Sequence, residues 1–505
     1  MERVLLLSAI AALSMRAGAI QGVVLEHASG RPLSRAIVRL EPVAKPGSPT
    51  PKGLTLRSGR SGYFVFPAVA SGLYLVVAER DGYFPGAYGQ RLPAGLGTPV
   101  TVTPDSSLFA EIRLRHKGAI TGRVLDENGV GRPGTTVFAY RAQLPLRSAG
   151  SAVSDDRGVY RIHGLAPGKY WVRSAAQTLD DGSGWLPTYG PQVREARDSR
   201  IHRVVVDADT TDADVSPDPG ALFRVGGIIT CDRDGMVTVV LSSETGRRQA
   251  QTSCKGSYMF DSIAPGNYEI FAKTQEGPPA AGFIEMFIGG DTLAANVQVL
   301  ETPAVDFEIR RAGTNSAADI PLILQARRQD LAVTESSREI RAGRVALDPG
   351  HWEFRAQVPE GYYVDSITNV FSYVRRPRRD AVVRDWYEVF IEARSPARIR
   401  LSVSDQPGEI SGVVRAESQP VPGVMVFLWP VEEAARRSIG GSRQLLTDTE
   451  GRFRFPSLPP GDYRVLATFD VNEIDEELLE LTRARTARAT ASQITSIELG
   501  VWQAP

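Results

Sequence analysis

The chain has 505 residues, and its 58 basic and 58 acidic side chains leave a formal net charge of zero. This balance excludes the strong positive field that would draw the chain to nucleic acid or to an anionic membrane. Apolar residues make up 42% and charged residues 23%, proportions that are ordinary for folded globular protein, so the length supplies apolar cores for several domains.

The first nineteen residues have the features of a secretory signal peptide. Arg3 precedes an apolar run from Val4 to Leu13, and small residues up to Ala19 predict cleavage after that position. The alternative interpretation is a first buried strand or helix. No later apolar stretch reaches the ~20 residues of a membrane helix, so we expect no membrane span. The expected location is periplasmic, extracellular or associated with the cell surface.

A Pro-Gly pair, or a close variant of it, recurs two residues ahead of an aromatic residue. Its glycines are Gly72, Gly168, Gly266, Gly350 and Gly461, and its aromatic residues are Tyr74, Tyr170, Tyr268, Trp352 and Tyr463. By subtraction, the glycines lie 96, 98, 84 and 111 residues apart, which is one small domain per period.

A turn glycine precedes this phrase by ten residues in four of the five repeats, at Gly62, Gly158, Gly256 and Gly451. Alternating aromatic and polar residues follow each of these glycines. The constant interval predicts a turn, a strand, a tight turn and a second strand. The fourth repeat is shorter, with seven residues from Gly343 to Gly350.

Each repeat except the fourth also opens with an apolar segment around a glycine, at Gly22, Gly122, Gly227 and Gly412. Short β-rich runs with regular turns, in units of about 100 residues, are typical of antiparallel β-sandwiches. The predicted fold class is therefore all-β, a tandem array of about five sandwiches after the signal peptide at residues 1–19.

The expected boundaries are 20–115, 116–207, 220–301, 302–404 and 405–505, with the fourth domain divergent. Residues 208–219 are rich in Asp, Pro and Thr and are predicted to be a linker. Residues 472–482 combine spaced leucines with acidic residues, which predicts a short helix on the last sandwich.

Together the opening segment, the alternating strand and the Pro-Gly-x-aromatic phrase resemble carboxypeptidase regulatory-like domains, most clearly over residues 120–172 and 410–465. The resemblance covers repeats one, two and five well, three moderately and four poorly. It implies a prealbumin-like (transthyretin-like) seven-stranded sandwich, a fold also classed with carbohydrate-binding-like and immunoglobulin-like folds. The whole arrangement is similar to exported proteins of acidobacterial soil bacteria. Such modules are appendages of enzymes, receptors and surface proteins alike, so the resemblance specifies a fold much better than an activity.

Both cysteines, Cys231 and Cys254, lie in the third repeat. The equivalent positions, or registers, of the first repeat are occupied by Glu26 and Arg60. If these registers touch, the third repeat has a disulfide and the first a salt bridge. The disulfide would contribute about 3 kcal/mol by the chain-entropy model, and the exposed ion pair at most about 1 kcal/mol. Two separate buried thiols are the alternative.

Aromatic residues recur in Pro- and Gly-rich loops after the hairpin, at Tyr83 and Tyr88 in repeat one and at Trp185 and Tyr189 in repeat two. An exposed ring can stack on a sugar or on a side chain of a partner. The alternative is that these rings cover the hairpin or fill the junction with the next module.

The sequence offers no catalytic, cofactor or metal site by motif. The five histidines are not spaced as metal ligands, and the segment from His351 to Glu353 lacks the spacing of a zinc peptidase. Turns rich in Asp and Gly are interpreted as turns rather than calcium loops.

We therefore expect no enzyme and no cofactor, but an exported scaffold or adhesion-like binding protein whose modules span distance and present loops to a partner. One alternative is a carbohydrate-binding protein that uses the loop aromatics. Another is an accessory of an envelope peptidase or an outer-membrane receptor. The expected partner is a polysaccharide or an envelope protein.

Overall fold

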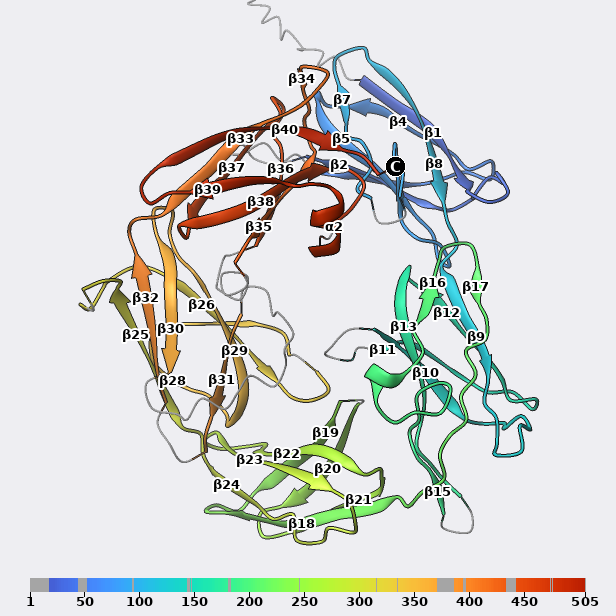
Figure 1. Ribbon diagram of the computed structural model, residues 1–505, viewed down its shortest axis with the longest axis vertical. Helices are drawn as coiled ribbons and strands as arrows, with labels where there is room; N and C mark the ends of the chain where they lie inside the picture. The colour runs from blue at the N-terminus through green and yellow to red at the C-terminus, as the bar shows by residue number, and fades with distance from the viewer. Residues whose placement is uncertain are drawn as a thin grey trace, which may run out of the picture.

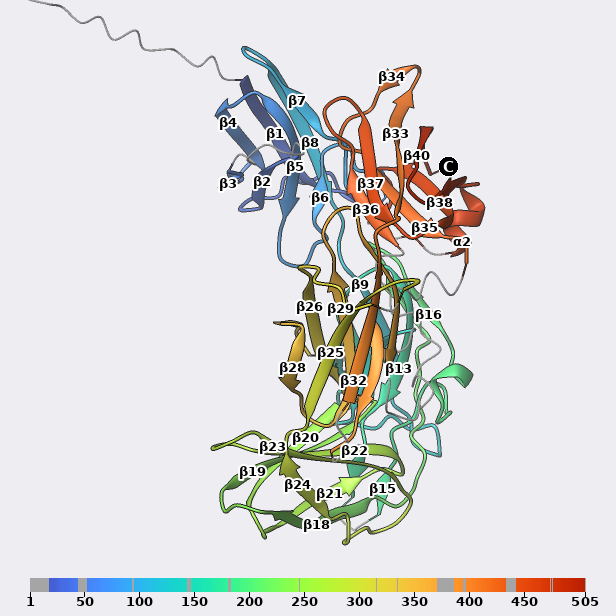
Figure 2. The ribbon, with the colours of Figure 1, turned by 90° about the vertical axis from the view of Figure 1, so that its left-hand side faces the viewer.

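The structure, a computed structural model, describes residues 18–504 except 44–51, 93–94, 143–145, 147, 180–182, 245, 315, 334, 370–385, 394–396, 433–441, 473 and 475. Most of the predicted signal peptide lies outside this part, although Gly18 and Ala19 belong to the first strand. The described strands form five groups, here called modules 1 to 5. Figure 1 shows that the modules follow one another around a ring, and Figure 2 shows that module 1 lies beside module 5.

Module 1 (residues 18–114) is a sandwich of two sheets. Its strands are β1 (Gly18–Glu26), β2 (Ile37–Pro42), β3 (Leu54–Arg57), β4 (Tyr63–Val69), β5 (Gly72–Glu79), β6 (Gly86–Ala87), β7 (Val100–Val102) and β8 (Ser107–Leu114). One sheet has the order β4-β1-β8 and the other β3-β2-β5-β6, with β7 also on β5. Alternate residues such as Ile20, Val38 and Val76 are fully buried between the sheets.

Module 2 (residues 118–215) repeats this plan. Its strands are β9 (Gly118–Arg123), β10 (Thr136–Arg141), β11 (Ser148–Val153), β12 (Val159–Leu165), β13 (Gly168–Ser174), β14 (Gln177–Thr178), β15 (Gly184–Trp185), β16 (His202–Val204) and β17 (Asp209–Thr210), with the 3-10 turn η1 (Ala196–Asp198) before β16. The main sheets have the orders β12-β9-β17 and β11-β10-β13-β16.

The predicted linker at 208–219 is wrong. Strand β17 pairs in parallel with β9, and Ala213 and Val215 are fully buried in the core of module 2. The short polar residues of this segment suit an edge strand of the sandwich as well as they suit a flexible connection, because only the buried positions need to be apolar.

Module 3 (residues 223–301) has one continuous sheet that folds over itself. Its strands are β18 (Phe223–Cys231), β19 (Met236–Ser243), β20 (Gly246–Ser253), β21 (Ser257–Ile263), β22 (Gly266–Thr274), β23 (Ala280–Ile288) and β24 (Val297–Glu301). Their order is β20-β19-β22-β23-β24-β18-β21, in which β24 pairs with both β23 and β18 and so joins the two layers.

Module 4 (residues 304–404) has the same first-to-last pairing despite its divergent sequence. Its strands are β25 (Ala304–Arg311), β26 (Ile323–Gln329), β27 (Arg338–Ile340), β28 (Gly343–Ala346), β29 (Gly350–Gln357), β30 (Tyr363–Asn369), β31 (Tyr387–Ile391) and β32 (Ala397–Ser404). The sheets have the orders β28-β25-β32-β30 and β27-β26-β29-β31.

Module 5 (residues 408–502) carries the predicted helix. Its elements are β33 (Gly408–Ala416), β34 (Gln419–Pro420), β35 (Met425–Pro430), β36 (Arg443–Leu446), β37 (Arg452–Leu458), β38 (Gly461–Thr468), α2 (Glu476–Leu481), β39 (Arg485–Ala489) and β40 (Ile494–Trp502). Leu479 of α2 and the preceding Ile474 pack on Phe427, Trp429 and Leu466. The all-β fold class is confirmed.

The opening glycines allow the first strand of a module to lie close to its last strand. In modules 1, 2, 3 and 5 a Cβ atom at this position would lie 1.8 to 2.3 Å from a backbone carbonyl oxygen of the neighbouring chain segment, namely that of Ala110, Ala213, Ala295 or Ile497. Each glycine also faces an aromatic residue across the antiparallel pair, as Gly412 faces Phe453. A side chain therefore has no room here.

In module 4 the glycine and the aromatic residue that face each other are on exchanged strands. Phe307 lies on the first strand, and the glycine opposite it is Gly343 on β28. The aromatic ring remains buried and packs edge-on against Phe354 with ring centroids 5.2 Å apart. This exchange explains why the fourth repeat lacks the opening glycine while keeping the strand pairing.

The aromatic residue of the Pro-Gly phrase ties each hairpin to the turn before it. In all five modules its polar tip donates a hydrogen bond to the carbonyl oxygen four residues earlier, over 2.7 to 3.0 Å, from Tyr74, Tyr170, Tyr268, Trp352 and Tyr463. The ring is packed and its polar atom is satisfied, which is the requirement for burying tyrosine or tryptophan.

We predict that Gly412→Ala destabilises module 5 by at least about 2 kcal/mol, because the new methyl group overlaps the Ile497 carbonyl and the Phe453 ring. Gly500→Ala, also in module 5, is the control, since nothing lies within 4 Å of its added Cβ. Scanning calorimetry of both variants checks this expectation. Equal transition temperatures for the two variants would contradict it.

Candidate functional site

Of the four loop aromatics, Tyr83 and Tyr88 are partly buried against the core of module 1. Tyr83 lies at the junction with module 2, where its ring centroid is 4.1 Å from that of His116. Its hydroxyl donates a hydrogen bond of 2.9 Å to Glu26. Tyr83 is therefore part of a junction between modules.

Trp185 and Tyr189 are buried, with 9% and 3% of their surface exposed. Trp185 pairs with Pro219 in the passage from module 2 to module 3, and the Arg132 guanidinium lies 4.1 Å from its ring centroid. Burial raises the pKa of Tyr189 to about 12. As placed, these two rings cannot stack on a sugar, and the alternative of rings that fill a junction or cover a hairpin fits their positions.

The expected pair between Glu26 and Arg60 is wrong. Glu26 instead accepts hydrogen bonds from Arg31, over 3.0 Å, and from Ser29 and Tyr83, and its Oε1 lies 2.6 Å from His116 Nε2. These bonds, that of Arg31 first, hold the pKa of the Glu26 carboxyl well below its usual range. The carboxylate thus ties module 1 to His116 in the segment that leads into module 2.

Cys231 ends strand β18 and Cys254 follows β20, and the structure joins them in a disulfide that spans 23 residues of chain. The bond ties the two layers of module 3 at one end. The two cysteine registers therefore do meet in space in this module.

The interface between modules 3 and 4 holds the cluster of side chains most suited to chemistry. On β29, alternate residues such as Trp352 and Phe354 point into the core of module 4, so His351 and Glu353 point outward. Both are nevertheless buried, with 4% and 0% exposed: Glu285 and Phe283 of module 3 lie against His351, and Arg327 of module 4 pairs with Glu353. Glu388 and Phe390 of β31 pair directly with Glu353 and His351 and so share the face.

Module 3 presents two glutamates to this face. Glu269 of β22 and Glu285 of β23 are direct cross-strand partners, and Phe271 and Phe283 form the next pair with the same orientation. Like charges directly opposite each other are destabilising, the more so because Glu269 is only 2% exposed. Positive charge from module 4 therefore stabilises this pair, and His351 and Arg328 both lie at this face.

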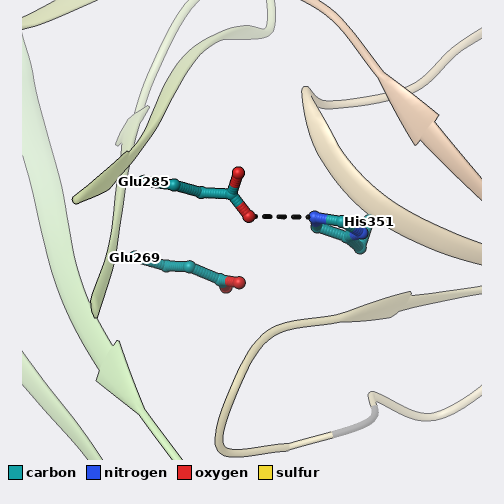
Figure 3. A group of neighbouring side chains, drawn as sticks. All are labelled: Glu269, Glu285 and His351. Carbon is teal, nitrogen blue, oxygen red and sulfur yellow. Dashed lines mark hydrogen bonds and ion pairs between the residues drawn. The ribbon is translucent and has the colours of Figure 1, made fainter. Parts of the chain in front are cut away.

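His351 meets these carboxylates from module 4 (Figure 3). Its Nε2 lies 3.2 Å from Glu285 Oε1, and its Nδ1 lies 3.2 Å from Glu388 Oε1. One ligand atom from each of Glu269, Glu285 and His351 lies within 4.8 Å of the others. The imidazole also contacts the rings of Phe283 and Phe390, with centroids 6.1 and 4.8 Å away.

The electrostatics of this face follow from burial and from close charges. Burial alone would lower the pKa of His351, but hydrogen bonds to Glu285 and Glu388 and their charges outweigh it and raise this pKa. Burial raises the pKa of Glu353, and the nearby Arg327 partly offsets that effect.

Further polar contacts surround the cluster and fix the two modules relative to each other. Asp330 accepts a hydrogen bond of 2.7 Å from Ser242 and pairs with Arg247, both on the module 3 side. Lys273 binds Asp348 over 2.6 Å. The buried Arg328 guanidinium lies 3.4 Å from the Phe271 ring centroid, which is a cation–π contact.

Sequence reasoning missed this cluster because its members come from two modules and share no local spacing. One signal was present: His351 and Glu353 alternate with apolar residues on a strand, a pattern that marks an outward face. That pattern alone does not distinguish a solvated face from one covered by a neighbouring module.

Comparison with known proteins confirms part of the resemblance. Residues 119–184 match the carboxypeptidase regulatory-like domain family. Colossin-A from Dictyostelium discoideum is 21% identical over 364 residues, which cover 64% of this chain and 3% of that protein. The matched part is thus a small fraction of its relative.

Among solved structures, the minor pilin GBS52 from Streptococcus agalactiae is 12% identical and covers 40% of this chain and 95% of its own, with a TM-score of 0.26. The pilus adhesin SpaC from Lactobacillus rhamnosus GG is 10% identical and covers 74% of this chain and 55% of its own, with a TM-score of 0.17. Scores at this level do not indicate a shared arrangement of the whole chain.

Within the described ranges, no helix has the length and apolar character needed to cross a bilayer.

For the cysteines, we predict that the chain denatured without reductant exposes no titratable thiol and that reduction exposes two. Thiol titration in guanidinium, before and after reduction, checks this expectation. Two reactive thiols before reduction would establish the alternative of separate buried cysteines.

Proposed function

We propose that this chain is an exported, non-catalytic scaffold that holds β-sandwich modules in a closed ring and presents their loops to a partner in the cell envelope or outside the cell. The observation that carries this proposal is the contact between the first and last modules. A contact between the first and last modules is expected of a closed frame and not of an extended string of modules. That each module folds independently stays a prediction.

This contact is made by the segment before β7. Leu96 donates a backbone hydrogen bond of 2.9 Å to the carbonyl oxygen of Phe469 in module 5. A Cβ atom at Gly95 would lie 2.9 Å from the same oxygen. Pro99 and Leu73 of module 1 pack against Gly423 of module 5. Backbone groups approach each other closely here, which requires small residues at the contact.

The junction of modules 4 and 5 is also polar and specific. Gly361 donates a backbone hydrogen bond of 3.0 Å to the Ser457 hydroxyl. Arg454 of module 5 binds Glu360 of module 4 over 2.5 Å and Glu409 of its own module over 2.7 Å. Junctions of this kind hold the modules in one geometry, and a preorganised surface loses less entropy when it binds a partner.

We predict that small-angle X-ray scattering of the purified chain fits the closed ring, and that Gly95→Trp increases the maximum dimension because the indole cannot fit beside Phe469. Gly290→Trp is the control, since nothing lies within 4 Å of its added Cβ. An extended particle for the unmodified chain would contradict the closed frame, as would identical curves for the two variants.

A second candidate function, binding of an acidic polysaccharide, is favoured by a groove on module 1. The groove has a volume of about 1180 Å³, and its lining includes Arg35, Arg57, Arg60, Arg80 and Lys117 against Glu79 and Asp81. Glu79 is already engaged by Arg39 at 2.7 Å. The local excess of positive charge attracts a polyanion even though the whole chain is neutral.

We predict that the chain binds polygalacturonate but not neutral dextran, and that Arg57→Gln with Arg60→Gln weakens binding by about tenfold, since each exposed ion pair contributes up to about 1 kcal/mol. Arg341→Gln with Arg344→Gln, two exposed arginines of module 4, is the matched control. Affinity electrophoresis at low and high salt measures the effect. Equal retention of both double variants would rule out this groove as the binding site.

A further inference from the structure

We infer that Glu269, Glu285 and His351 form a binding site for a divalent transition-metal ion, preferably Zn²⁺, at the junction of modules 3 and 4. The site stands apart from the proposed scaffold function, because an ion can bind here whatever the ring presents. Four observations carry it: the paired carboxylates, the separation of the ligand atoms, the support of the imidazole and the origin of the ligands in two modules.

The first observation is the density of negative charge. Glu269 and Glu285 are cross-strand neighbours on module 3, and Glu388 approaches the same imidazole from β31 of module 4. Three carboxylates thus lie around one imidazole, and of the proposed ligands Glu269 and His351 are buried whereas Glu285 is exposed. Arg328 of module 4 is buried against Phe271 in the same interface, while Lys273 binds Asp348 and Arg247 binds Asp330. A bound divalent ion adds positive charge at the centre of these carboxylates.

The second observation is the spacing of the ligand atoms. Zn²⁺ holds imidazole nitrogen and carboxylate oxygen at about 2.0–2.2 Å, which places neighbouring ligand atoms of a tetrahedral site roughly 3.3 Å apart. The distance from His351 Nε2 to Glu285 Oε1 is 3.2 Å, and the Glu269 oxygen lies within 4.8 Å of both. A tetrahedral site therefore requires the Glu269 oxygen to move closer to the other two ligand atoms.

The third observation is the support of the ligands. With Nε2 on the ion, His351 Nδ1–H donates to Glu388 Oε1 at 3.2 Å, the carboxylate–histidine–metal arrangement that fixes the tautomer and orientation of a liganding imidazole. The backbone N–H of Leu331 donates to Glu269 Oε2 over 3.3 Å. Phe283 and Phe390 flank the imidazole and restrict its rotation.

The ligand types select the ion. One imidazole nitrogen and two carboxylate oxygens suit Zn²⁺, with water in the fourth position, whereas Ca²⁺ and Mg²⁺ prefer oxygen ligands alone. Because the ligands come from β22 and β23 of module 3 and from β29 of module 4, the ion stabilises the junction. At ion concentrations above Kd, the stability that the ion adds to the joined modules increases with the logarithm of the ion concentration.

The test is isothermal titration of the full chain, treated with EDTA and dialysed, with ZnCl₂. We expect one ion per chain. Glu285→Gln keeps the size of the side chain and removes its charge, and should weaken binding at least tenfold, as should His351→Gln. Glu388→Gln removes only the support of the imidazole and should weaken binding about tenfold. Glu276→Gln, an exposed glutamate elsewhere in module 3, should leave it unchanged.

A second measurement covers the case in which a variant folds poorly. Co²⁺ bound to the unmodified chain should show visible absorption bands of a four-coordinate nitrogen and oxygen site, and Zn²⁺ should displace it and remove them. No saturable binding to the unmodified chain would overturn the inference and leave the imidazole held by the carboxylates alone. Binding that Glu285→Gln leaves unchanged would overturn it too, because the ion would then occupy other residues.

Discussion

The structure depends on one close approach that recurs along the chain: the first strand of each module lies between an antiparallel neighbour and the parallel last strand. At Gly22, Gly122 and Gly412 the neighbouring backbone comes so near that a Cβ atom would overlap a carbonyl oxygen. The aromatic residue opposite the glycine fills the space on the core side. This pair of glycine and aromatic residue brings the first and last strands of each module together, so each module has its own core. The same residues therefore recur in the sequence and make the repeats recognisable.

The faces that these sandwiches turn outward then decide how the modules meet. A strand in a two-layer sandwich has one face on its core, and its other face is free for solvent or for a neighbour. At the junction of modules 3 and 4, the outward faces of β22, β23, β29 and β31 cover one another. Several of their charged residues, such as Glu269, His351 and Glu353, are therefore buried, and His351 among the glutamates is the densest example. Buried charges of this kind favour one geometry of the junction over others, because any slip leaves a carboxylate without its partner.

Much of the fold could be predicted from local patterns, because a turn glycine and an aromatic residue ten residues apart act within one hairpin. The polar tip of Tyr463 or Trp352 binds a carbonyl only four residues away, so the whole motif is visible in a short stretch. The opening-glycine pattern failed in the fourth repeat because that module meets the same packing constraint with the two residues on exchanged strands. Module 4 keeps the pair of aromatic and glycine but places Phe307 on the first strand. In the predicted linker, the buried residues Ala213 and Val215 are too few to signal a strand.

The arrangement of the modules could not be predicted, because junctions bring together residues with no shared spacing. Trp185 and Tyr189 look like surface rings in a Pro- and Gly-rich loop, and only the path of the chain into module 3 shows that Trp185 is covered. Glu269 and His351 belong to different modules, and their proximity depends on how two outward faces pack.

The central claim is that the junctions between modules are fixed, and amide hydrogen exchange on the unmodified chain tests it most directly. The backbone N–H groups of Leu96, Leu331 and Gly361 lie in loops, and each donates to an acceptor in another module. Fixed junctions predict slow exchange at all three, whereas exchange at the rate of an unstructured peptide would show that the modules move independently.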